Sequence, residues 1–337
     1  MFKHHAKSIA FLSAISILSF CSSSLAVIKV RITTIGGTTF TTDHVPGQNI
    51  SITADNATSQ INIWSTTSTE TIGSVTIAGS GSNIVKVVIG SGAFGFTSPP
   101  GVNAAGDLKG ISTFRDKLWL YGRIGGNLTG NIFIGQVWAF TVGGQLVRGI
   151  TGTEGGPMNI RAGSIAAGPQ GNVLAQVGNI GLVDITDNML GNVIAQNGNI
   201  NNVMVGGNIG TPANPSDILA ATTINNIATT NVYANIDAGT TLAPANIGAL
   251  TTTGVFSGSL DAAEIENGGL VTIGGDLDGV ITLASSLLSS TEIRIGGSMS
   301  AGAAINVPSV GLAGQIVVNN NDLGGQWLGA VNVAQRR

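Results

Sequence analysis

Two short phrases decide the fold: VTIGGDLDG at residues 271–279 and IRIGGSM at residues 293–299. In both, apolar and polar residues alternate, and then two glycines, one small polar residue and one aliphatic residue follow. The alternation predicts a strand with one buried face. Glycine permits a corner of positive φ without a Cβ clash, and Asp or Ser suits a turn. Each phrase therefore predicts a strand, a corner and another inward-pointing side chain.

The same corner, a glycine followed by a small polar residue and an aliphatic one, recurs eleven times. The copies begin at Gly106, Gly126, Gly144, Gly163, Gly178, Gly198, Gly207, Gly258, Gly275, Gly297 and Gly314. Most steps between copies are 15 to 22 residues, and one step of 9 suggests that a coil carries the corner on more than one face. Such units become stable when stacked neighbours share an aliphatic core. We therefore predict an all-β chain, a parallel β-helix (β-solenoid) with roughly 18–20-residue coils.

The rival interpretation is a β-sandwich or a set of antiparallel hairpins. Sandwich strands also recur at short intervals. A sandwich gives no reason for one corner to recur eleven times, so the sequence favours the β-helix. In a β-helix, polar corner residues such as Asn179 and Asn199 stack on neighbouring coils, where we expect side-chain ladders.

The N-terminus has the layout of a secretory signal peptide. Basic residues such as Lys3 precede an uncharged run from Ile9 to Phe20, and small residues flank a cleavage point after Ala26. We therefore predict a signal peptide at residues 1–26 and a secreted, extracellular or cell-surface protein. The alternative is lipidation at Cys21, although lipoprotein signals place a small residue before the cysteine.

Removal of residues 1–26 leaves a chain with no cysteine and no integral membrane segment, since the apolar run is lost with them. We expect an N-terminal β region or cap over residues 27–98 and β-helix repeats over residues 99–337, divided at the Ser-Pro-Pro-Gly loop of residues 98–101. An alternative is that the sequence is a fragment of a larger secreted passenger.

The composition argues against several kinds of chemistry. After residue 26 the chain has 12 basic and 17 acidic residues, which disfavours nucleic-acid binding. His44 then remains as the single histidine, so we predict no metal site and no cofactor. Hydrolysis of a polysaccharide needs two carboxylates a few ångströms apart. Asp276 and Asp278 are the nearest pair, but Asp276 occupies the corner position that Asn, Ser or Gln fills elsewhere, so we predict a non-catalytic chain.

Aromatic residues concentrate between residues 114 and 140 in a chain that is only 5% aromatic. Trp119, Tyr121 and Trp138 could stack on sugar rings, while Asp116 and Arg123 could bond sugar hydroxyls. Alternation places Trp119, Tyr121 and Arg123 on one side of a strand, and arginine is rarely buried unpaired. The competing interpretation is that these rings fill wide coils.

Several phrases resemble those of a known family. IGGDLDG at residues 273–279, GNIG at residues 207–210 and GLAGQIVVNNN at residues 311–321 are similar to the glycine-rich repeats of extracellular bacterial β-helix proteins of planctomycete type. The resemblance implies a surface or secreted structural and adhesive protein, and it implies no site residues. We therefore expect an adhesin-like chain whose partner is an extracellular polysaccharide or a cell-envelope component. The runner-up is a polysaccharide lyase or hydrolase on the same fold.

Overall fold

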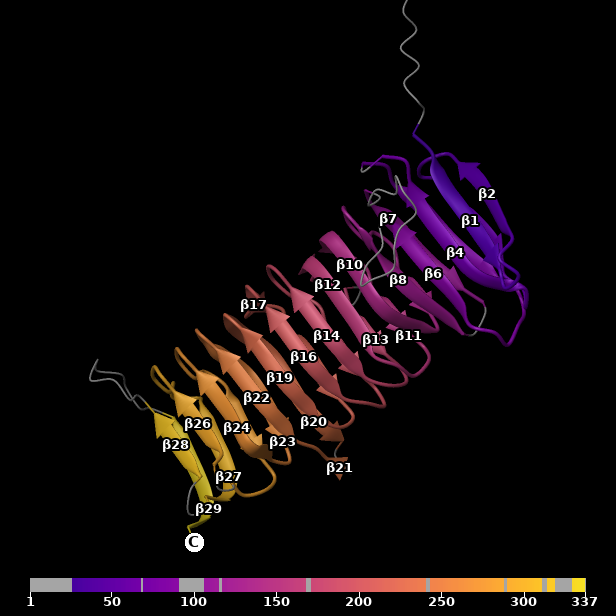
Figure 1. Cartoon of the computed structure of the whole chain (residues 1–337). Helices are drawn as coiled ribbons and strands as arrows, with labels where there is room; N and C mark the ends of the chain where they lie inside the picture. The colour runs from indigo at the N-terminus through magenta and orange to yellow at the C-terminus, as the bar shows by residue number, and fades with distance from the viewer. Residues whose placement is uncertain are drawn as a thin grey trace, which may run out of the picture.

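The protein is a rod of stacked β-coils (Figure 1). The computed structural model describes residues 26–67, 69–90, 106–114, 117–167, 171–240, 243–287, 290–310, 314–318 and 329–336, and over these residues it contains strands and no helix. The predicted signal peptide, apart from Ala26, and the predicted boundary at residues 98–101 lie outside the described residues.

Two long sheets form two faces of the rod. The first sheet contains, in spatial order, β2 (Thr39–His44), β1 (Ile28–Thr34), β4 (Thr58–Ser65), β6 (Val85–Gly90), β8 (Leu118–Ile124), β10 (Gln136–Leu146), β12 (Met158–Ile165), β14 (Ile180–Ile185), β16 (Ile200–Val205), β19 (Ile224–Thr229), β22 (Ile247–Thr252), β24 (Ile265–Ile273), β26 (Glu292–Ile295) and β28 (Gln315–Val318). From β4 to β28 every neighbouring pair is parallel, as expected when each coil stacks on the one before it.

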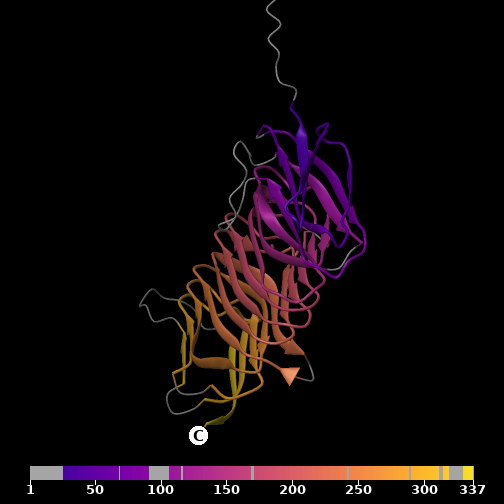
Figure 2. The same cartoon turned by 45° about the vertical axis from the view of Figure 1, so that its right-hand side comes forward.

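The second sheet contains β3 (Ile50–Thr53), β5 (Ile72–Ala78), β7 (Leu108–Thr113), β9 (Ile132–Ile134), β11 (Ile150–Gly152), β13 (Val173–Ala175), β15 (Val193–Ala195), β18 (Ser216–Ala220), β20 (Asn231–Thr240), β23 (Phe256–Ala262), β25 (Val280–Leu283), β27 (Ala304–Val310) and β29 (Ala330–Arg336). Two short strands, β17 (Asn208–Ile209) and β21 (Ala243–Pro244), pair with β20. Figure 2 shows the coils following one another in sequence order along the rod.

A third face is a column of single buried residues, each paired with its neighbours one coil before and one coil after. The column runs through Leu108, Leu128, Leu146, Ile165, Met189, Ile209, Val232, Phe256, Leu277 and Met299, all fully buried. These are the aliphatic residues of the corner phrase or their equivalents. With the two sheets, the column encloses one continuous aliphatic core, and the predicted parallel β-helix is therefore confirmed.

The coils are longer than the 18–20 residues we predicted. In the first sheet Ile180, Ile200, Ile224 and Ile247 are successive register partners, so these coils hold 20, 24 and 23 residues. The predicted coil length was too short for two reasons. The glycine corner precedes both third-face residues and first-sheet strands, so its spacing does not measure a full coil. Later coils also carry longer connections, including the tight turn in which Thr211 and Asn214 bond to each other.

Polar corner residues form the predicted ladders, although the bonds join side chains to backbone. Asn179 Oδ1 accepts a 2.9 Å hydrogen bond from the Asn199 N–H one coil on, at the corner before the first sheet. Asn188 Oδ1 does the same for the Asn208 N–H, at 2.8 Å, before the third face. Other pairs of this kind are Asp107 with Asn127, Asn127 with Gln145, Asn172 with Asn192, and Asp276 with Ser298. Corner amides that would otherwise face water are satisfied in this way.

The corner glycines serve mainly close approach, which corrects the expected role in positive-φ turns. Among the corner glycines that the structure describes, φ is positive at Gly178 and Gly258 only. A Cβ built on Gly126 would instead lie 2.2 Å from Asp107 Oδ1 and 2.8 Å from the Gly106 carbonyl carbon. Glycine is therefore required because the ladder oxygen and the preceding coil occupy the space of a side chain.

The N-terminal end departs from parallel stacking. β1 pairs antiparallel with both β2 and β4, and Lys29 Nζ lies 2.7 Å from Asp43 Oδ1 between β1 and β2. β3 (Ile50–Thr53), in contrast, pairs parallel with β5 and begins the second sheet. β1 runs antiparallel along the edge of β4, and β2 follows it, so the first sheet ends at this end of the rod on an exposed, threonine-rich strand.

Candidate functional site

The aromatic residues of β8 lie on the outer face of the first sheet. Leu118 and Leu120 are fully buried and point into the core, so Trp119, Tyr121 and Arg123 point outward between them. The prediction that these three residues share one side of a strand is confirmed by this alternation. Trp119 is half-buried and Arg123 is exposed, whereas Tyr121 is only 7% exposed.

A β-bulge in β10 brings Trp138 beside them. Val137 pairs with Leu120 and Ala139 pairs with Tyr121, which are consecutive in β8, so Trp138 is an extra residue without a register partner there. The bulge lets both Trp138 and Ala139 avoid the core before Phe140 points inward again. Bulges of this kind re-aim one side chain at a particular place on a sheet.

Trp119, Tyr121 and Trp138 form the group that we call the aromatic cluster. The ring centroids of Trp119 and Trp138 are 5.2 Å apart with planes tilted by 48°. Those of Tyr121 and Trp138 are 6.3 Å apart with planes only 15° from parallel. Trp138 is therefore close to both other rings, at separations that favour aromatic contact. Burial among these neighbours raises the pKa of the Tyr121 hydroxyl.

Hydrogen bonds fix Trp138 in place. Its indole Nε1–H donates to Gln136 Oε1 at 2.8 Å, and Gln136 Nε2 donates in turn to the Gly155 carbonyl at 2.7 Å. Asn159 Nδ2, from β12, donates to the Trp138 carbonyl at 2.7 Å. Trp138 is thus held in one orientation, and preorganisation of this kind lowers the entropic cost of any binding.

Comparison with known proteins assigns no family to the chain. No protein-family model, curated protein or solved structure matches the chain. A role for the site is therefore inferred from its own side chains. Over the described residues, no helix is long and apolar enough to cross a membrane.

The sequence missed Trp64, a second aromatic position on this face. Trp64 points outward from β4 but is only 6% exposed, because the guanidinium carbon of Arg31 lies 5.2 Å from its ring centroid. Ile61 and Ile63 point inward, so alternation along β4 could have placed Trp64 outside. Asp116, which we expected to bond sugar hydroxyls, lies outside the described residues.

The acidic candidates lie apart from the aromatic cluster. Asp276 Oδ1 accepts a 2.7 Å hydrogen bond from the Ser298 N–H and so acts as a corner residue. Asp237 and Asp261 were not foreseen: they are register partners on β20 and β23, on the outer face of the second sheet. Partial burial, followed by repulsion from Asp261, raises the pKa of the Asp237 carboxyl. Among the described residues, no three His, Cys, Asp or Glu side chains are grouped to hold a metal ion.

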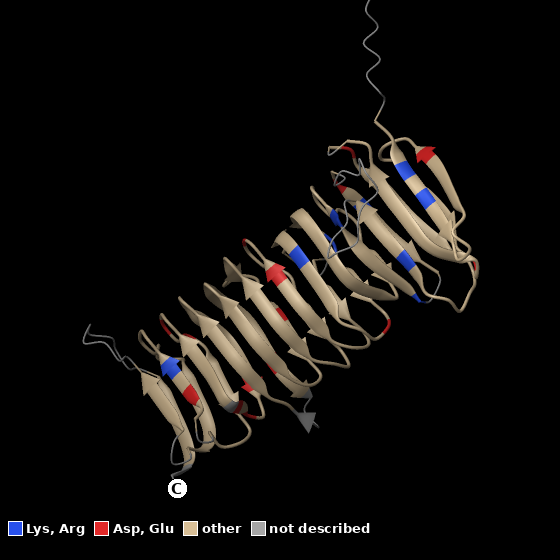
Figure 3. Cartoon of the chain, in the orientation of Figure 1, with Lys and Arg blue, Asp and Glu red and all other residues tan. Residues whose placement is uncertain are grey.

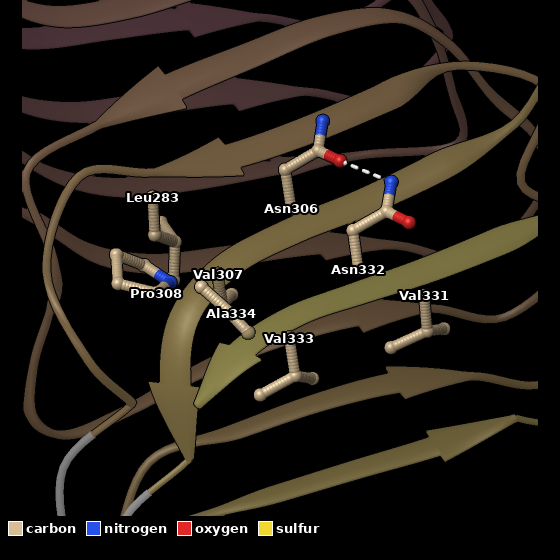
Figure 4. A pocket seen from close by; sticks show the side chains of 8 residues that line it. All are labelled: Leu283, Asn306, Val307, Pro308, Val331, Asn332, Val333 and Ala334. Atoms are coloured by element: carbon tan, nitrogen blue, oxygen red, sulfur yellow. Dashed lines mark hydrogen bonds between the residues drawn. The ribbon is translucent and has the colours of Figure 1, made fainter. Parts of the chain in front are cut away.

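Two hollows lie elsewhere on the rod. One, of about 560 Å³, lies at the C-terminal end, where Val331 and Val333 of β29 adjoin Val307 of β27, and Asn332 Nδ2 donates to Asn306 Oδ1 at 2.8 Å (Figure 4). Its lining residues include no ionisable side chain. The other, of about 480 Å³, lies along β14, β16 and β19, and Asp184 is its one ionisable lining residue. Neither lining supplies a pair of acids for hydrolysis.

Proposed function

We propose that the chain is a secreted, non-catalytic structural or adhesive β-helix that binds an extracellular polysaccharide at the aromatic cluster. The rod supplies a rigid frame, and its outer faces need no particular side chain to keep the core intact. Sugar-binding surfaces present rings to the apolar faces of the sugar and nearby amides to its hydroxyls. Trp119 and Trp138 are half-buried and so leave part of each ring at the surface. Export rests on the signal-like N-terminus, and adhesion rests on the repeat architecture.

The observation that carries the proposal is the bulge at Trp138. A regular β10 would need no extra residue between Val137 and Ala139. Trp138 is inserted there, on the outside, between two further outward rings and with its indole N–H fixed by Gln136. Packing of the core does not require this arrangement, because Val137 and Phe140 fill the core on either side. A surface prepared in this way suits a ligand with flat apolar faces.

The experiment that tests the proposal incubates the purified protein with a panel of immobilised polysaccharides and scores both retention and the release of new chain ends. We expect retention without release, and about tenfold weaker retention of Trp119→Ala. Phe133→Ala is the matched control, since Phe133 is an exposed aromatic residue on β9 of the second sheet. Equal retention of both variants, or retention of neither the wild type nor the control, would contradict the proposal.

The polysaccharide-active enzyme is the second candidate, and Asp237 with Asp261 is the observation that favours it. Their side chains project from paired strands, roughly 5 Å apart at the backbone, and the raised pKa of Asp237 suits a general acid beside a second acidic side chain. Release of new chain ends by the wild type, and its loss in Asp261→Asn, would support this candidate. Release that persists in that variant would exclude this pair.

A further inference from the structure

Charge is divided along the rod. Residues 27–161 contain nine Lys or Arg and six Asp or Glu, whereas residues 162–293 contain no Lys or Arg and ten Asp or Glu. In Figure 3 the basic residues gather over the N-terminal strands, and acidic residues follow from β14 onward. The protein is acidic overall, so this basic region is a local feature that the net charge hides.

The basic residues of this region concentrate on the face that carries the aromatic cluster. Six neighbouring strands, β1, β4, β6, β8, β10 and β12, contain five Lys or Arg and no Asp or Glu. All five alternate with buried residues and so point outward. They are Lys29, Arg31, Lys86, Arg123 and Arg161. The six strands span five inter-strand steps, or about 24 Å of surface.

Register places cations on both sides of the aromatic cluster. Lys86 of β6 is the register partner of Trp119, directly beside that ring. Arg123 follows Tyr121 by two residues on β8, and Thr141 is the register partner of both Arg123 and Arg161. Arg123 and Arg161 therefore lie in one row, two strands or about 10 Å apart. A chain lying over the rings passes between these positive groups.

Ion pairs lie at the two ends of this basic face, by which we mean the outer side of β1, β4, β6, β8, β10 and β12. Lys29 pairs with Asp43 at 2.7 Å at the β2 end, and Arg161 pairs with Asp184 of β14 at 3.2 Å at the other. Both pairs are at least partly exposed, so they are weak and open to competition from another anion. Beyond β14 the next strands of this face, β16, β19 and β22, carry no Lys or Arg, so they offer no opposite charge to an anion.

We propose that the ligand of the aromatic cluster is an acidic polysaccharide, one that bears carboxylate or sulfate groups at intervals along the chain. This inference rests on the proposed function, because it names the class of glycan that the cluster binds. The rings contact the sugar faces, while Lys86 and Arg123 pair with the acidic substituents. Arginine suits this purpose because its planar guanidinium matches a carboxylate or sulfate through two parallel hydrogen bonds. A neutral glycan would give no reason for six neighbouring strands to carry five Lys or Arg and no Asp or Glu.

A second copy of the chain is the competing occupant. Asp217, Asp237 and Asp261 make the outer face of β18, β20 and β23 acidic, and such a face complements the basic one in charge. Tyr233 of β20 is an aromatic residue on this outer face, and it is half-buried. No aromatic residue is a register neighbour of the three aspartates, whose neighbours include Asn235, Leu219 and Thr282. The aromatic cluster lies at the centre of the basic face, so a ligand with both flat apolar surfaces and anionic groups matches it better.

The experiment compares two forms of one polymer, polygalacturonate and its fully methyl-esterified form, which share a backbone and differ in charge. We expect the purified protein to bind the acid form at least tenfold more tightly at low salt. Raising salt from about 0.1 M to about 1 M, which shortens the Debye length from about 10 to about 3 Å, should remove most of that preference. Arg123→Gln should weaken binding of the acid form about three- to fivefold and leave the ester unchanged.

Controls separate the failure of this inference from the failure of the proposed function. Arg294→Gln removes an outward arginine of the same sheet at the opposite end of the rod, beside Glu292, and should change neither affinity. Trp119→Ala should weaken both polymers. Equal binding of the two polymers, with no effect of Arg123→Gln, would overturn the acidic ligand but keep the glycan site. Binding of neither polymer would overturn both proposals. Low-salt dimers that Arg123→Gln abolishes, without glycan binding, would assign the basic face to a second copy.

Discussion

The coils around β8 and β10 and those around β19 and β22 have the same interior and different exteriors. Leu120 and Val137 face the core in the first region as Ile227 and Leu250 do in the second, and all four are buried. On the outer face the first region presents the aromatic cluster. The second presents short side chains at paired positions, Asn226 beside Ala249 and Ala228 beside Thr251.

This difference shows what the fold requires and what it leaves free. Stacking requires inward aliphatic residues, corner glycines and ladder acceptors, and both regions supply them. It places almost no demand on outward residues, because these touch only their neighbours on the same face. The concentration of large rings and cations on the first-sheet strands from β1 to β12 is therefore a property added to the rod, and the contrast between the two regions can be tested by substitution.

The largest expected difference comes from deleting one residue at the aromatic cluster and one in β24, the strand next to β22. Deletion of Trp138 leaves Val137 and Ala139 adjacent, opposite Leu120 and Tyr121, which restores a regular β10. Deletion of Thr272 in β24 instead turns Ile273 from the core to the solvent. We expect the second deletion to cost about 3 kcal/mol or more and the first to cost far less. Urea denaturation followed by circular dichroism measures both. Equal losses of stability in the two deletion variants would show that packing of the core requires the bulge.

Glycine corners should behave alike near the aromatic cluster and far from it, at the corner that follows β26. A Cβ on Gly126 would lie 2.2 Å from Asp107 Oδ1, and a Cβ on Gly297 would lie 2.3 Å from Asp276 Oδ1. We expect Gly126→Ala and Gly297→Ala to destabilise the protein by a similar amount, about 2 to 3 kcal/mol each. Gly302→Ala is the control, because no atom lies within 4 Å of the added methyl group. A fall in the thermal midpoint for only one of these two variants would mean that the two coils are not stacked in the same way.

Ladder residues should contribute less, and only through their acceptor oxygen. Asn188→Ala removes the acceptor of the Asn208 N–H, and we expect a loss of about 1 kcal/mol. Asn188→Asp keeps that oxygen, as Asp107 and Asp276 do at equivalent corners, and should be nearly neutral. Urea denaturation measures the stability of both variants. If Asn188→Asp lost as much stability as Asn188→Ala, the ladder hydrogen bond would not be the source of the effect.

Sequence alone predicted what depends on local pattern. Corner phrases and alternation gave the β-helix, and alternation put Trp119 and Tyr121 on one side of a strand. The place of Trp138 could not be predicted, because the bulge is defined by register against β8 and not by β10 itself. The pairing of Asp237 with Asp261 was missed for a related reason: it requires a coil of 24 residues, longer than the corner spacing indicated.

The smallest effects concern two aspartates, one in each part of the rod. A hydrogen bond from the Thr58 hydroxyl, then one from the Ala57 N–H, lowers the pKa of Asp55 in the N-terminal part. Partial burial, then the charge of Asp261, raises the pKa of Asp237 in the C-terminal part. Ionised Asp55 therefore stabilises the folded protein above the unfolded pKa of 3.8, and this contribution is lost as pH falls through its lowered pKa.

Ionised Asp237 has the opposite sign: it destabilises the folded state above its raised pKa, and protonation relieves the cost as pH falls. We expect Asp237→Asn to raise the free energy of unfolding at neutral pH by a few tenths of a kcal/mol at most, seen as a higher urea midpoint, since the side chain is largely in water. Asp55→Asn should lower the midpoint at neutral pH. Both differences should shrink in acid, where each wild-type carboxyl is protonated. Asn235, two residues before Asp237 on β20, donates a hydrogen bond to Asp217. If the gain in stability of Asp237→Asn persisted in acid, the new amide would be stabilising the strand by a similar hydrogen bond and not by removing repulsion between Asp237 and Asp261.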